Sequence, residues 1–265
     1  MPLSPDDRAD AVERLRVAGC VFPEDEVTLL AAVAGSAGQL DAMVTRRVAG
    51  EPVEQIVGWA EFCGLRVAVE PGVFVPRHRT ELLARTAAAE ASPESIVVDL
   101  CCGSGAVGLA VATLVPGVQL HAVDIDPAAV RCARRNLAAL GGRVYEGDLF
   151  APLSVGLLGA VDLVTVNAPY VPSEQIELLP PEARLHEPRV ALDGGDDGLE
   201  IHRRVARSVG LWLAPGGTLL AECGTSQAPT LREIYAAAGG DVDVVLDADG
   251  ETAVVRLTTT PPPGG

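Results

Sequence analysis

Val161-Asp-Leu-Val-Thr-Val-Asn167-Ala-Pro-Tyr170 is the stretch around which the sequence is organised. Its β-branched run ends at a proline turn, which predicts a buried strand whose last residues lie at the rim of a sheet. Open α/β sheets bind their ligands at that rim. There the Asn167 side-chain oxygen can accept a hydrogen bond from a planar NH2 group, and the Tyr170 ring can stack on that group. We therefore predict that this stretch binds an amide or amino group. The alternative is that Asn167 caps a turn and Tyr170 fills the core.

An apolar strand, a glycine-rich turn and a helix of small residues precede this stretch, from Ile96 to Ala112. Gly103 and Gly105 carry no side chains, so the backbone there can approach a ligand closely. The helix that follows begins with free N–H groups, which favour a phosphate or another polar group. The unit predicts a nucleotide-like ligand.

Two acidic residues follow the next strands and are candidates for the same ligand. Asp124 ends the strand from Val118 to Val123, at the position where a carboxylate binds both hydroxyls of a ribose. The alternative is that Asp124 caps the next helix, a role that suits Asp126 better because it directly precedes a proline. Asp148 is expected to accept from an exocyclic amine, with Leu149 or Phe150 packing nearby, and simple loop capping is the alternative.

The rest of the chain predicts an α/β fold with a Rossmann-like, mostly parallel sheet of seven strands, because strands and helices alternate along the chain. Asp249-Gly250 lies between two apolar runs, which predicts that the sheet ends in an antiparallel hairpin. Four parts are expected: a helical N-terminal domain at residues 1–50, a β-hairpin linker at 51–80, the ligand-binding domain at 81–257 and a disordered tail at 258–265.

Composition limits the classes of function. The formal net charge of -16 disfavours direct nucleic-acid binding, because phosphate contacts need a clustered positive surface. Neither a secretory signal nor an apolar run of the ~20 residues that span a bilayer is evident, so we expect a cytoplasmic protein without membrane contacts. The 6 cysteines show no disulfide framework, and the 4 histidines lack metal spacing, so no metal is expected and surface or capping roles are predicted for the histidines. Arginines 203, 204 and 207 are expected to form a solvated helix face.

Together these motifs resemble the Rossmann-like S-adenosylmethionine-dependent methyltransferases. Within them the chain is similar to the HemK/PrmC group, the protein-glutamine methyltransferases that modify peptide-chain release factors. The similarity covers about Pro52 to Leu257, and its matching stretches are Ile56-Val-Gly58 with Phe62-x-Gly64, Val75-Pro76-Arg77 with Thr80-Glu81, Asp99 to Ala106, Asn167 to Tyr170, Glu187-Pro188 and Ala191 to Leu199. The linker and the Gly-Gly-Asp-Asp-Gly stretch are what favour the protein-glutamine group.

The resemblance implies transfer of a methyl group from S-adenosylmethionine to the side-chain amide nitrogen of a protein glutamine, with a release factor as the default substrate and S-adenosylhomocysteine as the product. It implies three sets of site residues. The catalytic set is Asn167, Ala168, Pro169 and Tyr170; the cofactor set is Asp99, Cys101, Gly103, Gly105, Asp124, Asp148, Leu149 and Asn167; the substrate set is Asn167, Tyr170 and Arg77. The N-terminal helices correspond by position to a substrate-recognition domain, with plain scaffolding as the alternative.

Three departures from the family pattern mark a divergent member. Ala168 stands where the family has the first proline of Asn-Pro-Pro-Tyr, and Cys101 stands where a glycine lies against the methionine part of the cofactor. His78 and Arg79 replace a proline and an acid beside the substrate path. Two other functions are open: the same Asn-Ala-Pro-Tyr geometry suits methylation of an exocyclic amine on a flipped nucleic-acid base, and the departures suggest cofactor binding without activity. The sequence leaves the oligomeric state undecided.

Overall fold

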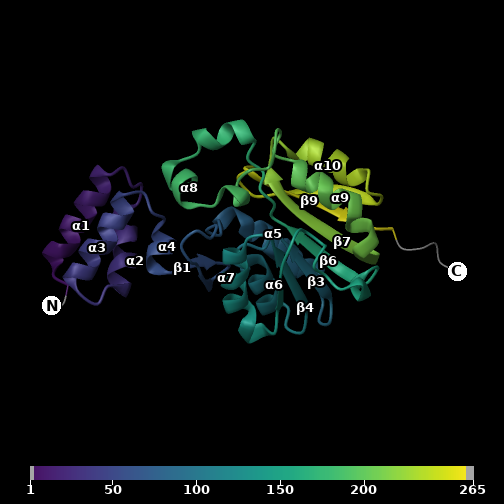
Figure 1. Cartoon of the computed structure of the whole chain (residues 1–265), viewed down its shortest axis with the longest axis horizontal. Helices are drawn as coiled ribbons and strands as arrows, with labels where there is room; N and C mark the ends of the chain where they lie inside the picture. The colour runs from purple at the N-terminus through teal and green to yellow at the C-terminus, as the bar shows by residue number, and fades with distance from the viewer. Residues whose placement is uncertain (1–2, 261–265) are drawn as a thin grey trace.

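The computed structural model describes residues 3–260, and its first helices form a bundle at one end of the molecule (Figure 1). The bundle consists of α1 (Pro5–Val17), α2 (Pro23–Val33), α3 (Ala37–Val48) and the short α4 (Val53–Val57). The Ser4 hydroxyl accepts from the Asp7 N–H at 3.1 Å, and the Asp7 carboxylate accepts from the Ser4 N–H at 2.8 Å, which caps α1. Leu15, Leu30 and Val44 form a separate small core. Helices α1 to α3 agree with the helical character predicted for this region.

A hairpin joins the bundle to the main sheet. Its strands β1 (Trp59–Phe62) and β2 (Leu65–Ala68) pair antiparallel around Cys63-Gly64, as predicted. The Asn136 side chain holds the end of the hairpin, because it accepts from the Ala68 N–H at 2.9 Å and donates to the Ala68 and Ser104 carbonyls at 2.9 and 2.8 Å. The hairpin is therefore fixed to the glycine-rich turn. The 3-10 turn η1 (His78–Thr80) and helix α5 (Glu81–Glu90) follow.

The main sheet has seven strands in the order β5-β4-β3-β6-β7-β9-β8. Pairing is parallel from β5 to β7, and β9 is antiparallel to both of its neighbours. The strands are β3 (Ile96–Leu100), β4 (Gln119–Asp124), β5 (Arg143–Glu146), β6 (Val161–Val166), β7 (Leu213–Gly224), β8 (Asp241–Leu246) and β9 (Thr252–Thr258). The chain leaves β3 toward β4 and returns to β6 on the other side of β3, so the topological switch point, where such sheets bind ligands, lies between β3 and β6.

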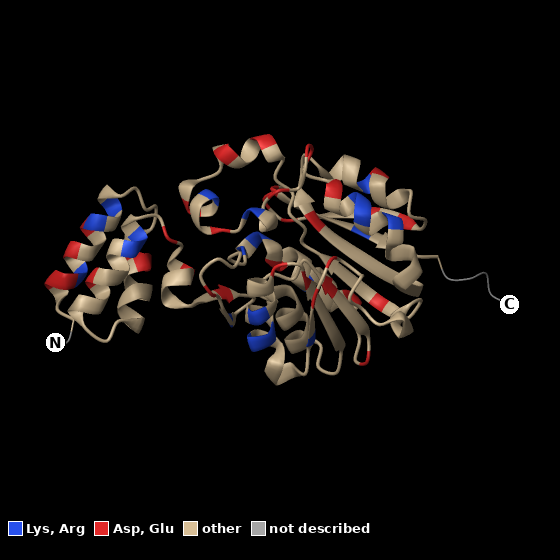
Figure 2. Ribbon diagram, in the orientation of Figure 1, with Lys and Arg blue, Asp and Glu red and all other residues tan. Residues whose placement is uncertain are grey.

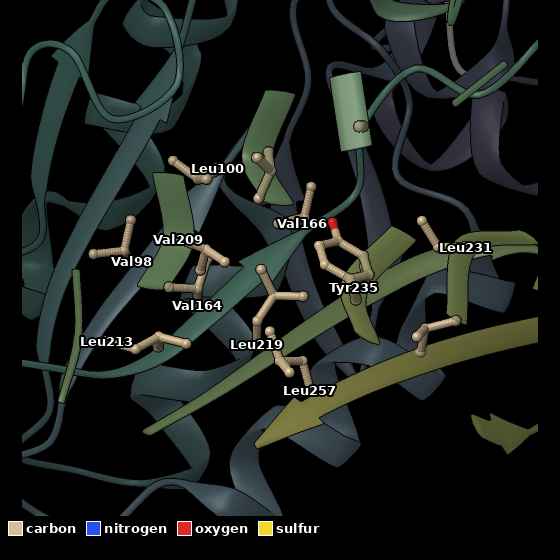
Figure 3. Packing of buried hydrophobic residues seen from close by; sticks show 14 of the residues in the cluster. Val98, Leu100, Val164, Val166, Val209, Leu213, Leu219, Leu231, Tyr235 and Leu257 are labelled. Carbon is tan, nitrogen blue, oxygen red and sulfur yellow. The ribbon is translucent and has the colours of Figure 1, made fainter. Parts of the chain in front are cut away.

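Helices cover both faces of the sheet (Figure 1). One face carries α5, α6 (Ala106–Leu114) and α7 (Pro127–Leu137), which is followed by the 3-10 turn η2 (Ala138–Leu140). The other face carries α9 (Glu200–Trp212) and α10 (Ala228–Ala236). Figure 3 shows the buried Tyr235 ring of α10 beside Val166 and Leu219 of the central strands. Neighbouring residues such as Val97 and Val98 pack on opposite faces, because strand side chains alternate. The predicted fold class is confirmed.

The connection from β6 to α9 runs over the carboxyl edge of the sheet and arches toward the bundle (Figure 1). It contains the 3-10 helices η4 (Ser173–Leu178) and η5 (Arg189–Ala191) and the short helix α8 (Pro181–His186). The 3-10 helix η3 (Val155–Leu157) lies between β5 and β6. The Arg47 guanidinium lies 3.1 Å from the Glu182 carboxylate and joins the bundle to this crossover. Figure 2 shows acidic and basic residues mixed along the ribbon of the bundle and the crossover.

One sequence expectation, the start of the tail, needs correction. Strand β7 begins at Leu213, which pairs with Val161 before a shift in register. The tail begins later than residue 258, because Thr258 pairs with Asp241 and Thr259 hydrogen bonds to the Gly217 carbonyl; residues 261–265 lie outside the described part. Thr80 stands at the N-cap of α5, but its side chain makes no capping bond. No helix within residues 3–260 is long and apolar enough to cross a membrane.

Candidate active site

A tight turn joins β3 to α6 and has left-handed backbone angles. Cys101, Gly103 and Gly105 have φ values of 55, 55 and 79°. A Cβ on Gly105 would approach Ala133 to 3.2 Å, so this glycine allows α7 to pack closely, whereas a Cβ on Gly103 would meet no atom within 4 Å. Gly103 therefore leaves its side of the turn open to a ligand. Cys101 takes the same conformation at a cost of about 1–2 kcal/mol, because its Cβ crowds the backbone there.

Asp124 ends β4 beside this turn. Its Oδ2 accepts from the Gly103 N–H at 2.8 Å, and its Oδ1 accepts from the Asp126 N–H at 2.9 Å. Each oxygen keeps one lone pair, so a fixed carboxylate remains available for two hydroxyl donors. Burial raises the pKa of Asp124, while the two backbone N–H groups lower it. Asp126 caps α7 through the Ala128 N–H at 2.8 Å, so the alternative of Asp124 as the helix cap is wrong.

Asp99 lies one strand away and is almost completely buried. Its Oδ1 accepts from the Thr165 hydroxyl at 2.8 Å, and its Oδ2 accepts from the Gly108 N–H at 3.1 Å. Burial raises the pKa of Asp99 to about 7 in spite of these bonds. The residue thus ties β3 to β6 and to the first turn of α6. Direct contact between Asp99 and a cofactor stays a prediction.

Asp148 and Leu149 follow β5 at the same edge of the sheet. Leu149 has a φ of 49°, which turns the chain back toward the sheet. The Arg204 guanidinium of α9 donates to Asp148 Oδ2, although these residues are 56 positions apart. Arg204 stays partly exposed to solvent, as predicted for this helix face, and its partner is a predicted cofactor residue. The other Asp148 oxygen, Oδ1, remains available as an acceptor.

One cavity of about 1150 Å³ joins these strand ends to the loop after β6. Nearly all of the predicted site residues line it: Arg77, Asp99, Cys101, Gly103, Asp124, Asp148, Leu149, Asn167, Ala168, Pro169 and Tyr170. Gly105 does not, because its Cα faces α7. The volume exceeds that of an ordinary small-molecule site, so a nucleotide-like ligand and a second reactant fit together.

Asn167 is the first residue after β6. Its Nδ2 donates to the Thr80 hydroxyl at 3.3 Å, which leaves Oδ1 as an acceptor, and the residue lines the cavity. Ala168 is 2% exposed, and within residues 3–260 no backbone N–H donates to its carbonyl. The Tyr170 hydroxyl accepts from the Arg79 guanidinium, which also lies 5.8 Å from the centre of the Tyr170 ring. The loop therefore presents two oxygen acceptors and one aromatic ring.

The glycine-rich stretch before α9, residues 194–198, packs against the end of the loop that carries Asn167. Val171 N–H donates to the Leu192 carbonyl at 3.0 Å, and Gly194 N–H donates to the Val171 carbonyl at 2.9 Å. A Cβ on Gly198 would stand 2.1 Å from the Tyr170 carbonyl oxygen, and that oxygen also accepts from Gln227 Nε2 at 3.1 Å. Sequence reasoning noted the glycines but not this function, because the contact joins segments that are distant in the chain.

Two buried carboxylates lie next to Arg77 and Arg79, which line the cavity. Glu187 Oε1 accepts from Arg77 at 2.6 Å, and Glu222 Oε1 lies 3.9 Å from Arg79 Nε. The Oε2 atoms of both glutamates are buried without a hydrogen-bond partner in the described part of the chain. Burial raises the pKa of both carboxyls, and the adjacent arginine lowers each. In the amino-acid pattern, only the position of Glu222 at a strand end pointed to its burial.

Two of the four histidines contradict the predicted surface or capping roles. His202 is 0% exposed and its Nδ1 lies 3.0 Å from the Tyr235 hydroxyl, while His121 is 3% exposed and stacks on Tyr145. Both belong to the packing of the fold and lie away from the cavity.

Comparisons with known proteins agree with this geometry. A family profile described as "Methyltransferase small domain" matches residues 64–191. The release factor glutamine methyltransferase of Geobacter sulfurreducens is 40% identical over 80% of this chain and 75% of its own length. A 4-amino-L-phenylalanine/4-methylamino-L-phenylalanine methyltransferase of Streptomyces pristinaespiralis is 39% identical over 74% of this chain and 69% of its own length.

Solved structures support the fold. A methyltransferase from Pyrococcus furiosus matches with a TM-score of 0.55 and 15% identity, over 75% of this chain and 90% of the other chain. The predicted family, enzyme class and cofactor are confirmed, and the methyl donor is S-adenosylmethionine. This protein belongs to the HemK/PrmC family of release factor glutamine methyltransferases.

Proposed function

We propose that this enzyme methylates the side-chain amide nitrogen of a glutamine in a peptide-chain release factor. The observation that carries the proposal is the orientation of Asn167, whose NH2 group is engaged by Thr80 so that Oδ1 is left for an acceptor in the cavity. A release factor is the proposed substrate because relatives that are similar to this chain over most of their length carry that substrate in their names.

The residues of the cofactor half fit S-adenosylmethionine. Asp124 offers two oxygens, each with a free lone pair, to the ribose hydroxyls, and Asp148 Oδ1 is available to the adenine amine with Leu149 beside it. The open turn at Gly103, next to Cys101, accommodates the methionine part. When bound, the cofactor supplies a methyl group carried on a sulfonium sulfur.

The residues of the acceptor half prepare a poor nucleophile. An amide lone pair is delocalised into its carbonyl, so the amide nitrogen must be held in position for attack. Asn167 Oδ1 and the Ala168 carbonyl accept its two N–H bonds and stabilise the positive charge that develops on nitrogen. Tyr170 packs on the amide plane. Because one N–H proton leaves only after the N–C bond forms, we assign no general base.

Transfer of a radiolabelled methyl group to purified release factor tests this proposal. The protein should label the factor on glutamine, and Asn167→Ala should lose most of the transfer while it still binds S-adenosylmethionine in calorimetry. Label on RNA or DNA and not on protein would show that the acceptor is a nucleic-acid base. If the wild-type chain binds no S-adenosylmethionine, both enzymatic proposals fail.

A second candidate acceptor is the amine of a small aromatic amino acid. Arg79 favours it, because this half-exposed cation lines the cavity beside Tyr170, and it stands where the family has an acid. A free amino acid would bring a carboxylate to that cation, and the Streptomyces pristinaespiralis relative is named for such a substrate. Parallel assays with 4-amino-L-phenylalanine and release factor decide between them. Release factor should have the higher kcat/KM, and the reverse order would favour the small amine.

Location, partners and domain roles follow from the same proposal. We place the enzyme in the cytoplasm, where release factors act, and we expect no direct binding to nucleic acid because the net charge is -16. The bundle of residues 1–50 is proposed to recognise the protein substrate, with the linker at 51–80 and the methyltransferase domain at 81–257. Removal of the bundle should then raise KM for release factor and leave the cofactor affinity unchanged.

A further inference from the structure

The side chain of Gln227 joins the Asn-Ala-Pro-Tyr loop to the glycine-rich stretch at residues 194–198. Its Nε2 donates to the Tyr170 carbonyl at 3.1 Å and to the Asp197 carbonyl at 3.1 Å. Tyr170 and Gln227 are 57 positions apart, so the contact exists only in the folded chain. Within residues 3–260, no other hydrogen bond reaches a backbone group of residues 168–170. The Gln227 amide therefore holds a part of the loop that has no other backbone partner.

The two partners determine the orientation of this amide. A backbone carbonyl oxygen only accepts hydrogen bonds, and a glutamine NH2 group has two protons, one for each carbonyl. With the amide reversed, Gln227 Oε1 would face two carbonyl oxygens, and both hydrogen bonds would be lost. The observed orientation is therefore the one in which the side chain binds both segments.

Gln227 is itself fixed at the start of α10. Its N–H donates to the Gly224 carbonyl at the end of β7 at 2.9 Å, and its carbonyl accepts from the Leu231 N–H at 2.9 Å. Leu231 is fully buried in the core. Asp197 is fixed as well, because its Oδ1 accepts from the Leu199 N–H at 3.1 Å. The bridge therefore connects the loop to two segments that are tied to the core.

The position of the Tyr170 carbonyl matters for the acceptor half of the cavity. Tyr170 carries the ring that packs on the acceptor amide, and it follows Ala168, whose carbonyl is a proposed acceptor, by two residues. Its hydroxyl accepts from Arg79, so the residue is held at its ring and at its backbone. Gly198 leaves room for this arrangement, because a Cβ there would lie 2.5 Å from Gln227 Nε2. Gln227 thereby fixes where the loop presents its carbonyl oxygen and its ring.

We propose that Gln227 is a positioning residue of the methyl transfer, which fixes the loop of Asn167 and Tyr170 by donating both of its amide protons. This inference rests on the proposed function, since it assigns a part in the same reaction. Gln227 is not among the residues that line the cavity, so it acts through the loop and not by contact with a reactant. A capping role does not explain its side chain, which makes no capping bond at α10.

Two substitutions of Gln227 test the proposal. Gln227→Met keeps the length of the side chain and removes both donors, whereas Gln227→Glu keeps the shape and replaces the donors with a carboxylate that only accepts. Each should lower kcat on the order of 10-fold, because a small displacement of a group that positions a reactant slows the reaction. The affinity for S-adenosylmethionine should stay nearly unchanged. A packing role alone predicts a different result, a kcat near that of wild type in the isosteric Gln227→Glu.

Thr259→Val is the matched control for the loss of such a bridge. The Thr259 hydroxyl lies 2.9 Å from the Ala214 carbonyl oxygen and 3.1 Å from the Gly217 carbonyl oxygen, at the opposite end of β7. The control therefore loses a side-chain contact to two backbone carbonyls that is remote from the loop, and its kcat should equal that of wild type. Full kcat in both Gln227 variants, or an equal fall of kcat in Thr259→Val, would overturn the proposal.

Fluorine NMR gives a readout that needs no substrate. The chain has 3 tyrosines, so protein labelled with 3-fluorotyrosine gives a simple spectrum, in which the Tyr170 signal is identified by its loss in Tyr170→Phe. This signal should shift or broaden in Gln227→Met and Gln227→Glu and stay as in wild type in Thr259→Val. The Tyr145 signal, from the edge strand β5, is the internal control and should not change in any variant.

The two experiments separate failure of this inference from failure of the proposed function. An unchanged Tyr170 signal in both Gln227 variants would refute the bridge even if release factor is methylated. Lack of release factor methylation by wild type would refute the proposed function, and the fluorine spectra would still show whether Gln227 fixes the loop.

Discussion

Gly198→Ala is the substitution that most directly probes the support of the Asn-Ala-Pro-Tyr loop. Gly198 has a φ of 77°, and a Cβ there would lie 2.1 Å from the Tyr170 carbonyl oxygen. No side chain can occupy that position unless one of the two backbones moves. The loop that carries Asn167 is the one that must yield, because Gly198 lies two residues before α9 and the next residue, Leu199, is buried in the core.

The size of the effect follows from two contributions. A non-glycine residue in the left-handed region costs about 1–2 kcal/mol. Overpacking a filled site costs about 1–3 kcal/mol more. The free energy of unfolding should therefore fall by roughly 2–5 kcal/mol. Gly141→Ala is the matched control, since Gly141 has a φ of 70° but a Cβ there meets nothing within 4 Å, so only the first contribution applies.

Urea unfolding and steady-state kinetics measure the two consequences. Gly198→Ala should be less stable than Gly141→Ala, and its kcat should fall by about 100-fold, because a displacement near 1 Å at a reacting group has that effect. The affinity for S-adenosylmethionine should change little, since the predicted cofactor residues Gly103 and Asp124 belong to other segments of the chain. Equal stability of the two variants together with a normal kcat would refute the view that this contact positions the loop.

Three further predictions concern the cofactor half and the core. Asp124→Asn should raise the Kd for S-adenosylmethionine by about 10- to 100-fold, because hydrogen bonds to a charged acceptor are stronger than those to a neutral one. The control Asp126→Asn keeps its helix cap and should leave the Kd unchanged in calorimetry. Burial lowers the pKa of His202 to about 4 from the usual 6.5, so unfolding takes up a proton between these values. The free energy of unfolding should fall by roughly 3 kcal/mol as the pH drops from 6.5 to 4, and this slope should be smaller in His202→Gln. Cys101→Gly should unfold at higher urea and still bind S-adenosylmethionine, because glycine adopts φ 55° without the steric cost; a less stable variant would show that thiol packing outweighs backbone strain.

The sequence predicted the parts of this molecule that depend on local pattern. The run from Val161 is β6, and its end lies at the switch point of the sheet, as the apolar run and the proline turn indicated. The turn at Asp249-Gly250 joins β8 and β9 as an antiparallel pair. These predictions succeeded because strand periodicity and turn chemistry are properties of a few consecutive residues.

The contacts between polar side chains could not be predicted in the same way. Arg204 looked like a solvated helix residue because its neighbours in sequence are charged, yet its partner Asp148 comes from another strand end. Threonine is a residue type that often caps helices. The Thr80 side chain makes no capping bond, and its hydroxyl instead accepts from Asn167. Gly198 was recognised as part of a family pattern, whereas its physical reason, the approach of the Tyr170 carbonyl, exists only in the folded chain. Such partners depend on the register and packing of distant elements.

The central claim is that Asn167 holds a glutamine amide of a release factor for methylation. Tandem mass spectrometry of release factor tests it most directly, in cells that lack this protein and are complemented with wild type or with Asn167→Ala. The account predicts a methyl group on one glutamine side chain with wild type, and little or none without the protein or with Asn167→Ala. An unmethylated glutamine in wild-type cells, or equal methylation with Asn167→Ala, would contradict it.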